Sequence, residues 1–261
     1  MKKYIIQIVF LFIFVSNAFA QKDQFVAASS LMQFSIIDAL LAGEYDGVYR
    51  LGNLLKHGDF GIGTFDKLDG EMIVLDGVIY QFKSNGKIYT ADKTSSTPFA
   101  SVVKFRTDYS FAFTRPMNIK TLQTVIDSVI KNKNLFYAIK ATGDFSSMKT
   151  RSVPAQIKPY KPLSEVTKTQ AVFEKESQKG TLVGFKLPSF VGGINVPGYH
   201  LHFLSKDKTF GGHILDFSVS KLKVEIQELN RFEMLLPEGD NSFNQIDLSK
   251  DRSEELEKVE K

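Results

Sequence analysis

The sequence contains no cysteine and no tryptophan, and only four of its 261 residues are histidine. Without cysteine the chain has no disulfide bond, no thiolate metal ligand and no thiol nucleophile, so nitrogen and oxygen atoms must bind any metal. Internal repeats and low-complexity tracts are also absent. A hydrophobic fraction of 43% and a charged fraction of 24% are ordinary for a folded globular chain, which argues against general disorder.

Positive charge is too evenly spread to indicate nucleic-acid binding. The formal net charge is +4 and the pI is about 9.0, but acidic residues are interspersed among the basic ones and no basic stripe forms. Lys2 and Lys3 belong to an N-terminal segment that we expect to be removed, which lowers the net charge from +4 to about +2. We therefore expect no nucleic-acid partner.

Residues 1–20 have the features of a secretory signal peptide. Lys2 and Lys3 form its positive start, residues 5–15 are apolar apart from one glutamine, and the sequence Ala-Phe-Ala at 18–20 is a small-x-small cleavage site. The apolar run is too short for a comfortable membrane span, and an uncleaved anchor is the alternative. With no cysteine for lipid attachment, we expect a secreted or periplasmic chain that starts near Gln21 and does not bind a membrane.

Hydrophobic spacing and turn residues predict a strand-rich chain with a few helices. Apolar residues at helical spacing predict a helix over 30–43 that ends at Gly43. Asp76-Gly77 and Asn85-Gly86 predict two hairpin turns. The remaining expected strands are 100–106, 135–142, 180–186, 199–204, 213–222 and 223–229, and the remaining expected helices are 121–131 and the charged tail 251–260.

This pattern predicts the α+β class, with two mixed, mainly antiparallel β-sheet halves and flanking helices. Three prolines interrupt residues 153–163, which indicates a linker or a crossing between domains. We therefore expect a signal peptide at 1–20, an N-terminal α/β domain at 21–152 and a β-rich C-terminal domain with a helical tail at 153–261.

Three of the four histidines are close together in the sequence, in the segments GYHLHF (198–203) and GGHILD (211–216). Because residues i and i+2 of a strand point to the same face, His200 and His202 project together, and the apolar residues beside them face a core. A turn centred on Asp207-Lys208 would place His213 directly opposite His202 in a symmetric hairpin, with Cβ atoms about 5 Å apart.

Three imidazoles that converge in this way can hold a catalytic metal and leave positions open for water and substrate. Zinc is the first candidate, although iron, nickel and copper also accept imidazole. The alternative is that the three histidines are ordinary polar residues on a solvated strand face. His57 lies in a glycine-rich loop and is expected to be structural or adjacent to substrate rather than a ligand.

Four separated motifs, in order, resemble the bacterial alpha-acetolactate decarboxylases over nearly the whole chain after about Met32. They are HGDFGIGTF (57–65) with LDGEM (68–72), TRSVP (150–154) with KPY (158–160), GYHLHF (198–203) and GGHILDF (211–217). The resemblance implies two α/β domains with zinc in the cleft between them, and a homodimer. It also implies the conversion of (S)-2-acetolactate to (R)-acetoin and carbon dioxide.

By position, the resemblance implies that His200, His202 and His213 bind zinc. It further implies that Glu71 is an active-site glutamate, that Thr64 lines the site and that Arg151 meets the substrate. The family also uses a glutamate from the C-terminal tail, for which this sequence offers four, with Glu260 preferred, then Glu257, and Glu254 and Glu255 as further possibilities.

The implied chemistry suits these groups. Loss of carbon dioxide leaves an electron pair that the adjacent ketone can accept as an enediolate, and zinc chelated by the hydroxyl and ketone oxygens would stabilise it. No pyridoxal or thiamine cofactor is then needed. Two other classes remain open on the residues alone: a secreted three-histidine metal-dependent hydrolase or oxygenase, and a non-catalytic extracellular module that binds a metal or a ligand.

Overall fold

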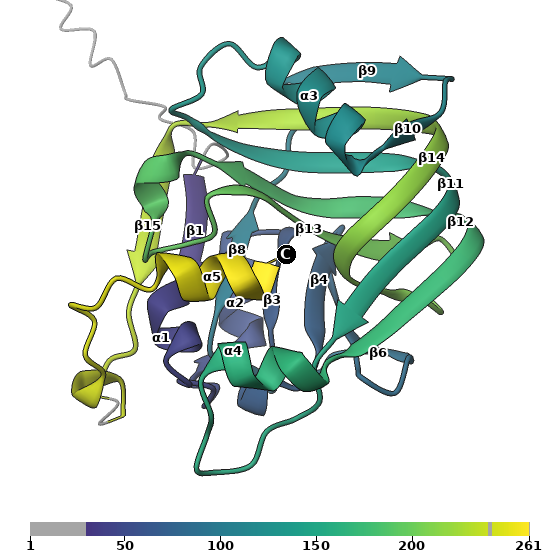
Figure 1. The fold of residues 1–261 in the computed structure, drawn as a ribbon. Helices are drawn as coiled ribbons and strands as arrows, with labels where there is room; N and C mark the ends of the chain where they lie inside the picture. Colours follow the sequence, from purple (N-terminus) through teal and green to yellow (C-terminus); the bar gives the residue numbers. More distant parts are fainter. Residues whose placement is uncertain (1–29, 240–241, 261) are drawn as a thin grey trace, which may run out of the picture.

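The structure, a computed structural model, describes residues 30–239 and 242–260 (Figure 1). The predicted signal peptide lies outside these residues. Most of the described chain forms a seven-stranded sheet, a six-stranded sheet and a short two-stranded pairing, with short helices around them. This arrangement confirms the predicted α+β class with mixed, mainly antiparallel sheets.

The seven-stranded sheet contains one parallel pair, β15 with β1, and is otherwise antiparallel. Its order is β15 (Arg231–Leu235), β1 (Ser30–Phe34), β8 (Ala100–Val103), β3 (Phe60–Thr64), β4 (Glu71–Leu75), β5 (Val78–Phe82) and β6 (Ile88–Thr90). The first predicted hairpin is confirmed, because Leu75 pairs with Val78 across a two-residue turn. In that turn Asp76 (φ 52°) and Gly77 (φ 76°) adopt the left-handed backbone conformation that such turns require.

The six-stranded sheet contains the longest strands. It is formed by β9 (Tyr109–Phe113), β10 (Met117–Asn118), β11 (Phe136–Ser152), β12 (Ala171–Leu187), β13 (Gly198–Ser205) and β14 (Gly211–Leu229). β13 pairs with both β12 and β14, and β11 also pairs with both β12 and β14. These four strands therefore pair in a closed, barrel-like ring. The separate two-stranded pairing joins β2 (Tyr49–Arg50) and β7 (Ser96–Thr97).

The helices are α1 (Ile37–Leu41), α2 (Leu51–His57), α3 (Ile119–Val129), α4 (Leu163–Val166) and α5 (Ser253–Glu260), with short 3-10 turns η2 (Asp66–Leu68), η3 (Thr167–Thr169), η4 (Ser189–Val191) and η5 (Phe243–Gln245). In Figure 1, α3 lies beside β9 and β10, and α5 crosses the middle of the view near α1 and α4. In the part of the chain that the structure describes, no helix has the length and apolar character needed to span a bilayer.

Two cores position the site described below. Phe60, Ile62 and Ile73 of the first sheet pack with Val183 and Phe185 of the second, so the sheets are held face to face by a shared apolar layer. Beside this layer, apolar residues of α1, α4 and α5 form a second cluster. The C-terminal helix is thereby fixed against the body of the protein.

The predicted helix over 30–43 is wrong in its first part. Ser30–Phe34 is strand β1, which lies between β15 and β8, and only Ile37–Leu41 is helical. Residues 31–34 are all buried, including the polar Gln33, so β1 shows no alternation of buried and exposed positions and its apolar spacing does not separate strand from helix. Gly43, with a φ of +100°, follows the helix as expected.

Both sheets take strands from either side of the predicted boundary at residue 152. β11, which precedes it, pairs with β12 and β14, and β15, which follows it, pairs with β1. The division at 21–152 and 153–261 stays a prediction. Residues 153–163 run without a strand from the end of β11 to α4, as the three prolines there suggest.

Candidate active site and metal centre

The three clustered histidines come from two neighbouring strands whose register brings them together. His200 and His202 lie on β13, and His213 lies on β14 directly opposite His202. The hairpin register predicted from the sequence is thus confirmed. The ring centroids are 5.0–5.4 Å apart in the three pairs, and one ligand nitrogen from each ring lies within 4.8 Å of the other two.

The hydrogen bonds of His202 fit a metal ligand. Its Nδ1 lies 2.8 Å from the carbonyl oxygen of Met72 on β4. A carbonyl only accepts hydrogen bonds, so Nδ1 donates and Nε2 carries the lone pair. This Nε2 is buried and has no hydrogen-bond partner among the described residues. A buried acceptor beside two further imidazoles is a donor set that suits a metal cation.

The electrostatic surroundings keep the imidazoles neutral, which is the form that binds metals. Burial, helped by the positive charge of Arg151, lowers the pKa of His200 to about 3. Burial also lowers the pKa of His202 and of His213 well below the ordinary value, and Arg151 and the neighbouring histidines act in the same direction. The three rings therefore present nitrogen lone pairs at neutral pH.

Two features of β14 set the position of His213. Gly212 has a φ of +123°, which favours glycine, and a Cβ atom there would lie 2.7 Å from the carbonyl oxygen of Arg151. A β-bulge, in which Leu215 is the extra residue, follows on the side that pairs with β11. Bulges bend a strand and re-aim its side chains. A larger residue at 212 would push β14 away from β11 and displace His213.

The first sheet contributes Thr64 and Glu71. They are directly opposed on β3 and β4, so they share a face, and their exposed fractions are only 5% and 9%. The Thr64 hydroxyl donates to the carbonyl oxygen of Gly70 at 2.8 Å. The Glu71 Oε2 atom lies 3.6 Å from Nε2 of His202. The cluster is therefore bounded by both sheets.

Arg151 lies on β11, directly opposite His213, so its side chain is on the same face of the sheet. Its side chain is 6% exposed. The Nη1 group donates to Oε1 of Gln170 at 2.9 Å, and Nη2 lies 3.8 Å from Oε1 of Glu260. A permanent positive charge thus stands beside the three neutral imidazoles.

Among the tail glutamates, the structure places Glu260 in the site. Leu256 and Val259 are buried in the cluster that α5 shares with α1 and α4. This docking carries Glu260, the last residue of α5, to 3.9 Å from Nε2 of His200 and 3.8 Å from Nε2 of His213. The other three lie elsewhere: Glu254 and Glu257 are exposed, and Glu255 accepts a hydrogen bond from Arg252.

The two carboxyl groups of the site hold protons more readily than ordinary glutamates. Burial raises the pKa of Glu71 to about 7, against the opposing effect of Arg151 and with a smaller contribution from Glu260. Burial also raises the pKa of Glu260, again opposed by Arg151. A cation bound at the histidines would lower both pKa values, because positive charge favours the carboxylate. Such groups suit proton transfer.

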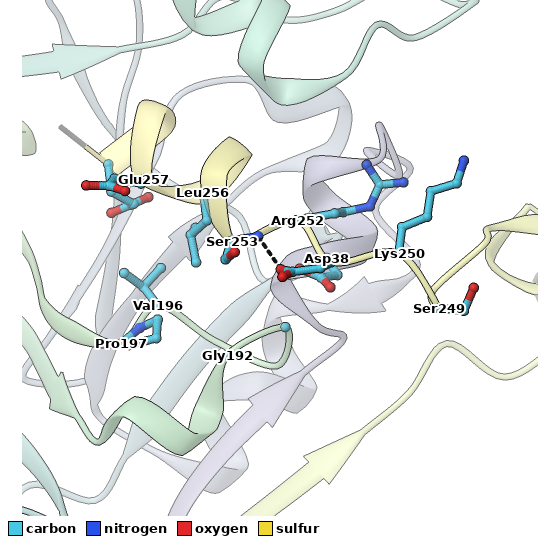
Figure 2. A pocket seen from close by; sticks show the side chains of 13 residues that line it. Asp38, Gly192, Val196, Pro197, Ser249, Lys250, Arg252, Ser253, Leu256 and Glu257 are labelled. Carbon is cyan, nitrogen blue, oxygen red and sulfur yellow. Dashed lines mark hydrogen bonds between the residues drawn. The ribbon is translucent and has the colours of Figure 1, made fainter.

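One cavity of about 50 Å³ is lined by all seven predicted site residues, with apolar walls from α1, α4 and α5. A larger cavity of about 540 Å³ lies between α5, the start of α1 and residues 192–197 (Figure 2). Glu260 is the residue that lines both. The smaller cavity holds the convergent nitrogen ligands and the shifted carboxyl groups, so we assign the chemistry to it.

Two residues need separate mention: His57, which lies away from the site, and Gln170, which the sequence analysis does not predict. His57 ends α2 and lines a separate cavity with Lys56, Lys104 and Arg231, apart from the other histidines. Gln170, which contacts Arg151, was not predicted, because no motif includes it. The register of β11 and β12 would have revealed it, because Arg151 pairs with Val172 and Gln170 lies two residues before Val172.

Comparison with known proteins connects this geometry to a family. The family model described as alpha-acetolactate decarboxylase matches residues 31–250. The alpha-acetolactate decarboxylase of Methanosarcina mazei is 46% identical over 235 residues, covering 90% of this chain and 81% of that protein. The corresponding protein of Methylococcus capsulatus is 44% identical, covering 88% of each. This chain belongs to the alpha-acetolactate decarboxylase family.

Solved structures agree with this membership. The alpha-acetolactate decarboxylase of Bacillus subtilis strain 168 superposes with a TM-score of 0.87 at 37% identity, covering 89% of this chain and 99% of that one. A Staphylococcus aureus protein described as similar to alpha-acetolactate decarboxylase gives 0.85 at 31% identity, covering 88% and 99%. The resemblance read from the motifs is confirmed. Family membership supports acetolactate decarboxylase activity, which is that of a decarboxylating lyase.

Proposed function

We propose that this protein is a metal-dependent acetolactate decarboxylase that converts (S)-2-acetolactate to (R)-acetoin and carbon dioxide. The observation that carries the proposal is the convergence of His200, His202 and His213 beside the buried Arg151. Glu71 and Glu260 complete the site from the first sheet and from the C-terminal helix. These groups match the needs of the reaction.

Zinc is the metal we propose for the three histidines. When bound, it supplies a Lewis acid for the hydroxyl and ketone oxygens of the substrate and favours the negative charge that develops on the ketone oxygen. The neutral imidazoles, and the buried Nε2 of His202 that lacks a donor among the described residues, support this assignment. The hydrogen bond from His202 to the Met72 carbonyl holds that ring in place.

Arg151 is proposed to bind the substrate carboxylate. In the reaction, the bond between the carboxylate carbon and the carbinol carbon breaks, and its electron pair moves toward the adjacent ketone to give an enediolate. A guanidinium that grips the carboxylate fixes the direction of the breaking bond relative to the ketone. The side chain of Arg151 is 6% exposed, so water screens its charge poorly.

Glu71 and Glu260 are the proposed proton-transfer groups. The enediolate gains a proton at the carbinol carbon on one face only, which yields (R)-acetoin. Both carboxyl groups line the site cavity and come from different elements, β4 and α5, so they approach the substrate from different directions. Burial raises the pKa of both carboxyl groups, to about 7 for Glu71, which brings Glu71 into the range suited to proton transfer near neutral pH. Thr64 lines the cavity beside Glu71.

Export and assembly complete the proposal. The sequence features of residues 1–20 support a secreted or periplasmic enzyme, and the family resemblance supports a homodimer. Acetoin formation from racemic acetolactate, followed with the metal removed by chelator and then restored, tests the proposed activity. Acetoin should form with metal present and cease without it. Metal-replete enzyme that forms no acetoin would contradict the proposal.

A further inference from the structure

The guanidinium of Arg151 is only partly engaged by its neighbours. Nη1 donates to Gln170, while the 3.8 Å separation of Nη2 from Glu260 is longer than a hydrogen bond. Nε is buried and has no hydrogen-bond partner among the described residues. Burying a donor of a charged group without a partner is unfavourable, so this edge of the guanidinium is suited to an incoming acceptor.

Gln170 is placed for this contact by the strand register. Arg151 pairs with Val172 across β11 and β12, and Gln170 precedes Val172 by two residues. Residues two apart face the same side of a strand, so Gln170 is the diagonal neighbour of Arg151, within reach of a long side chain. The backbone N–H of Gln170 donates to the carbonyl oxygen of Thr167, which ties the residue to the η3 turn just before β12.

The chemical type of residue 170 is also informative. An amide oxygen accepts a hydrogen bond from the guanidinium without cancelling its positive charge, whereas a carboxylate would form an ion pair and compete with an anionic ligand. At this position the chain has the neutral acceptor. The arrangement therefore holds Arg151 through Nη1 without adding a second negative charge to that of Glu260, whose Oε1 lies 3.8 Å from Nη2.

We propose that Gln170 is a positioning residue that occupies Nη1 of Arg151 and so presents the Nε and Nη2 edge to the substrate carboxylate. Two parallel N–H groups on that edge match the two oxygens of a carboxylate. This inference rests on the proposed function, because it assigns the carboxylate of acetolactate as the ligand of Arg151. Gln170 lies outside the four sequence motifs, and in this role it would help the site to select a substrate that carries a carboxylate.

Two substitutions of similar size separate positioning from packing. Gln170→Met removes the acceptor with little change in volume, and Gln170→Glu keeps an acceptor but adds a negative charge. Gln178→Met is the matched control, because Gln178 lies on β12 far along the strand from Arg151 and its amide donates to the Glu176 carbonyl. Metal-replete proteins are compared by kcat and KM for acetolactate. Inhibition is measured with 2-hydroxy-2-methylpropanoate, a carboxylate, and with acetoin, which has none.

We expect Gln170→Met to raise KM about tenfold and the inhibition constant of the carboxylate by a similar factor. The inhibition constant of acetoin should stay within about twofold, because acetoin has no carboxylate and does not use the guanidinium edge. Gln170→Glu should raise KM further, to roughly 30-fold, because it neutralises Arg151. The control variant should match the parent enzyme.

A purely structural role for Gln170 predicts a different order. In that case Gln170→Glu would be the milder change, and both inhibitors would weaken together. A milder effect of Gln170→Glu than of Gln170→Met, weaker binding of both inhibitors, or an unchanged KM in Gln170→Met would each overturn the inference. None of these results would affect the proposed decarboxylase activity. Parent enzyme that forms no acetoin would instead overturn the proposed function, and this inference with it.

Discussion

Arg151 and His213 are directly opposed residues on β11 and β14, and His213 is in turn opposed to His202 on β13. One register line across three strands therefore places a permanent positive charge beside two of the three imidazoles. Because opposed residues share a face of the sheet, this arrangement follows from strand pairing alone. The site is thus built on rigid elements, with one helix, α5, closing it.

Replacing Arg151 tests the proposed carboxylate grip. Arg151→Ala should lower kcat/KM by at least 30-fold, as expected when one partner of a buried charge-assisted contact is removed. Arg151→Lys should recover only part of the loss, because lysine keeps the charge but not the planar fork. Steady-state kinetics and metal analysis are the measurements. Equal kcat/KM in Arg151→Ala and the parent, at equal metal content, would show that Arg151 does not bind the substrate carboxylate.

The tail glutamates provide a matched pair of variants. Glu260→Gln should lower kcat by about 100-fold or more, the usual effect of losing a proton-transfer group. Glu257→Gln, one turn earlier on the same helix and exposed, should stay within about twofold of the parent. Single-turnover acetoin formation distinguishes them. A larger loss in Glu257→Gln than in Glu260→Gln would show that Glu260 is not the working glutamate.

Removing the tail separates metal binding from turnover. A chain that ends at Lys250 lacks α5, and with it Glu260 and the apolar contacts of Leu256 and Val259. The histidines lie on β13 and β14, so we expect the metal to remain bound while acetoin formation is lost. Metal analysis and an activity assay on the same sample check both parts. Retained turnover would remove α5 from the mechanism.

The predicted pH dependence concerns metal-free protein. Burial lowers the pKa of His200 from its ordinary value of 6.5 to about 3, so between these values the unfolded chain binds a proton that the folded chain does not. Its contribution to stability is therefore present above pH 6.5 and is lost as pH falls. Between pH 7.5 and 5.5 this loss should be about 1.4 kcal/mol.

Denaturant unfolding of the parent and of His200→Gln, both treated with chelator, measures this loss. Other titrating groups act in both proteins, so the difference between their pH dependences isolates His200. The parent should lose more unfolding free energy than the variant as pH falls. Identical pH dependence in the two proteins would show that His200 is not held neutral by burial.

The histidine cluster could be predicted because its signal is local. Alternation along a strand put His200 and His202 on one face, and the turn at Asp207-Lys208 fixed the partner of His202. Period-two spacing and turn chemistry involve few residues, and tertiary packing did not override them here. The same holds for the hairpin at Asp76-Gly77.

Other features depend on contacts that spacing does not encode. The choice among the tail glutamates depends on how Leu256 and Val259 dock against α1 and α4. The apolar spacing of residues 30–43 predicts a helix where β1 lies, because the pairing of β1 with β15, some 200 residues away, decides its conformation. Gln170 was missed because its role comes from the register of β11 with β12. In each case the deciding partner is distant in the sequence.

Metal content and acetoin formation, measured on one purified sample before and after chelation, show whether the three histidines hold a catalytic metal. We expect about one bound metal ion per chain, loss of acetoin formation when the metal is removed and recovery when zinc is added. His202→Ala should bind little metal and form no acetoin. Turnover of acetolactate at an undiminished rate by metal-free protein would show that the histidine cluster does not hold a catalytic metal.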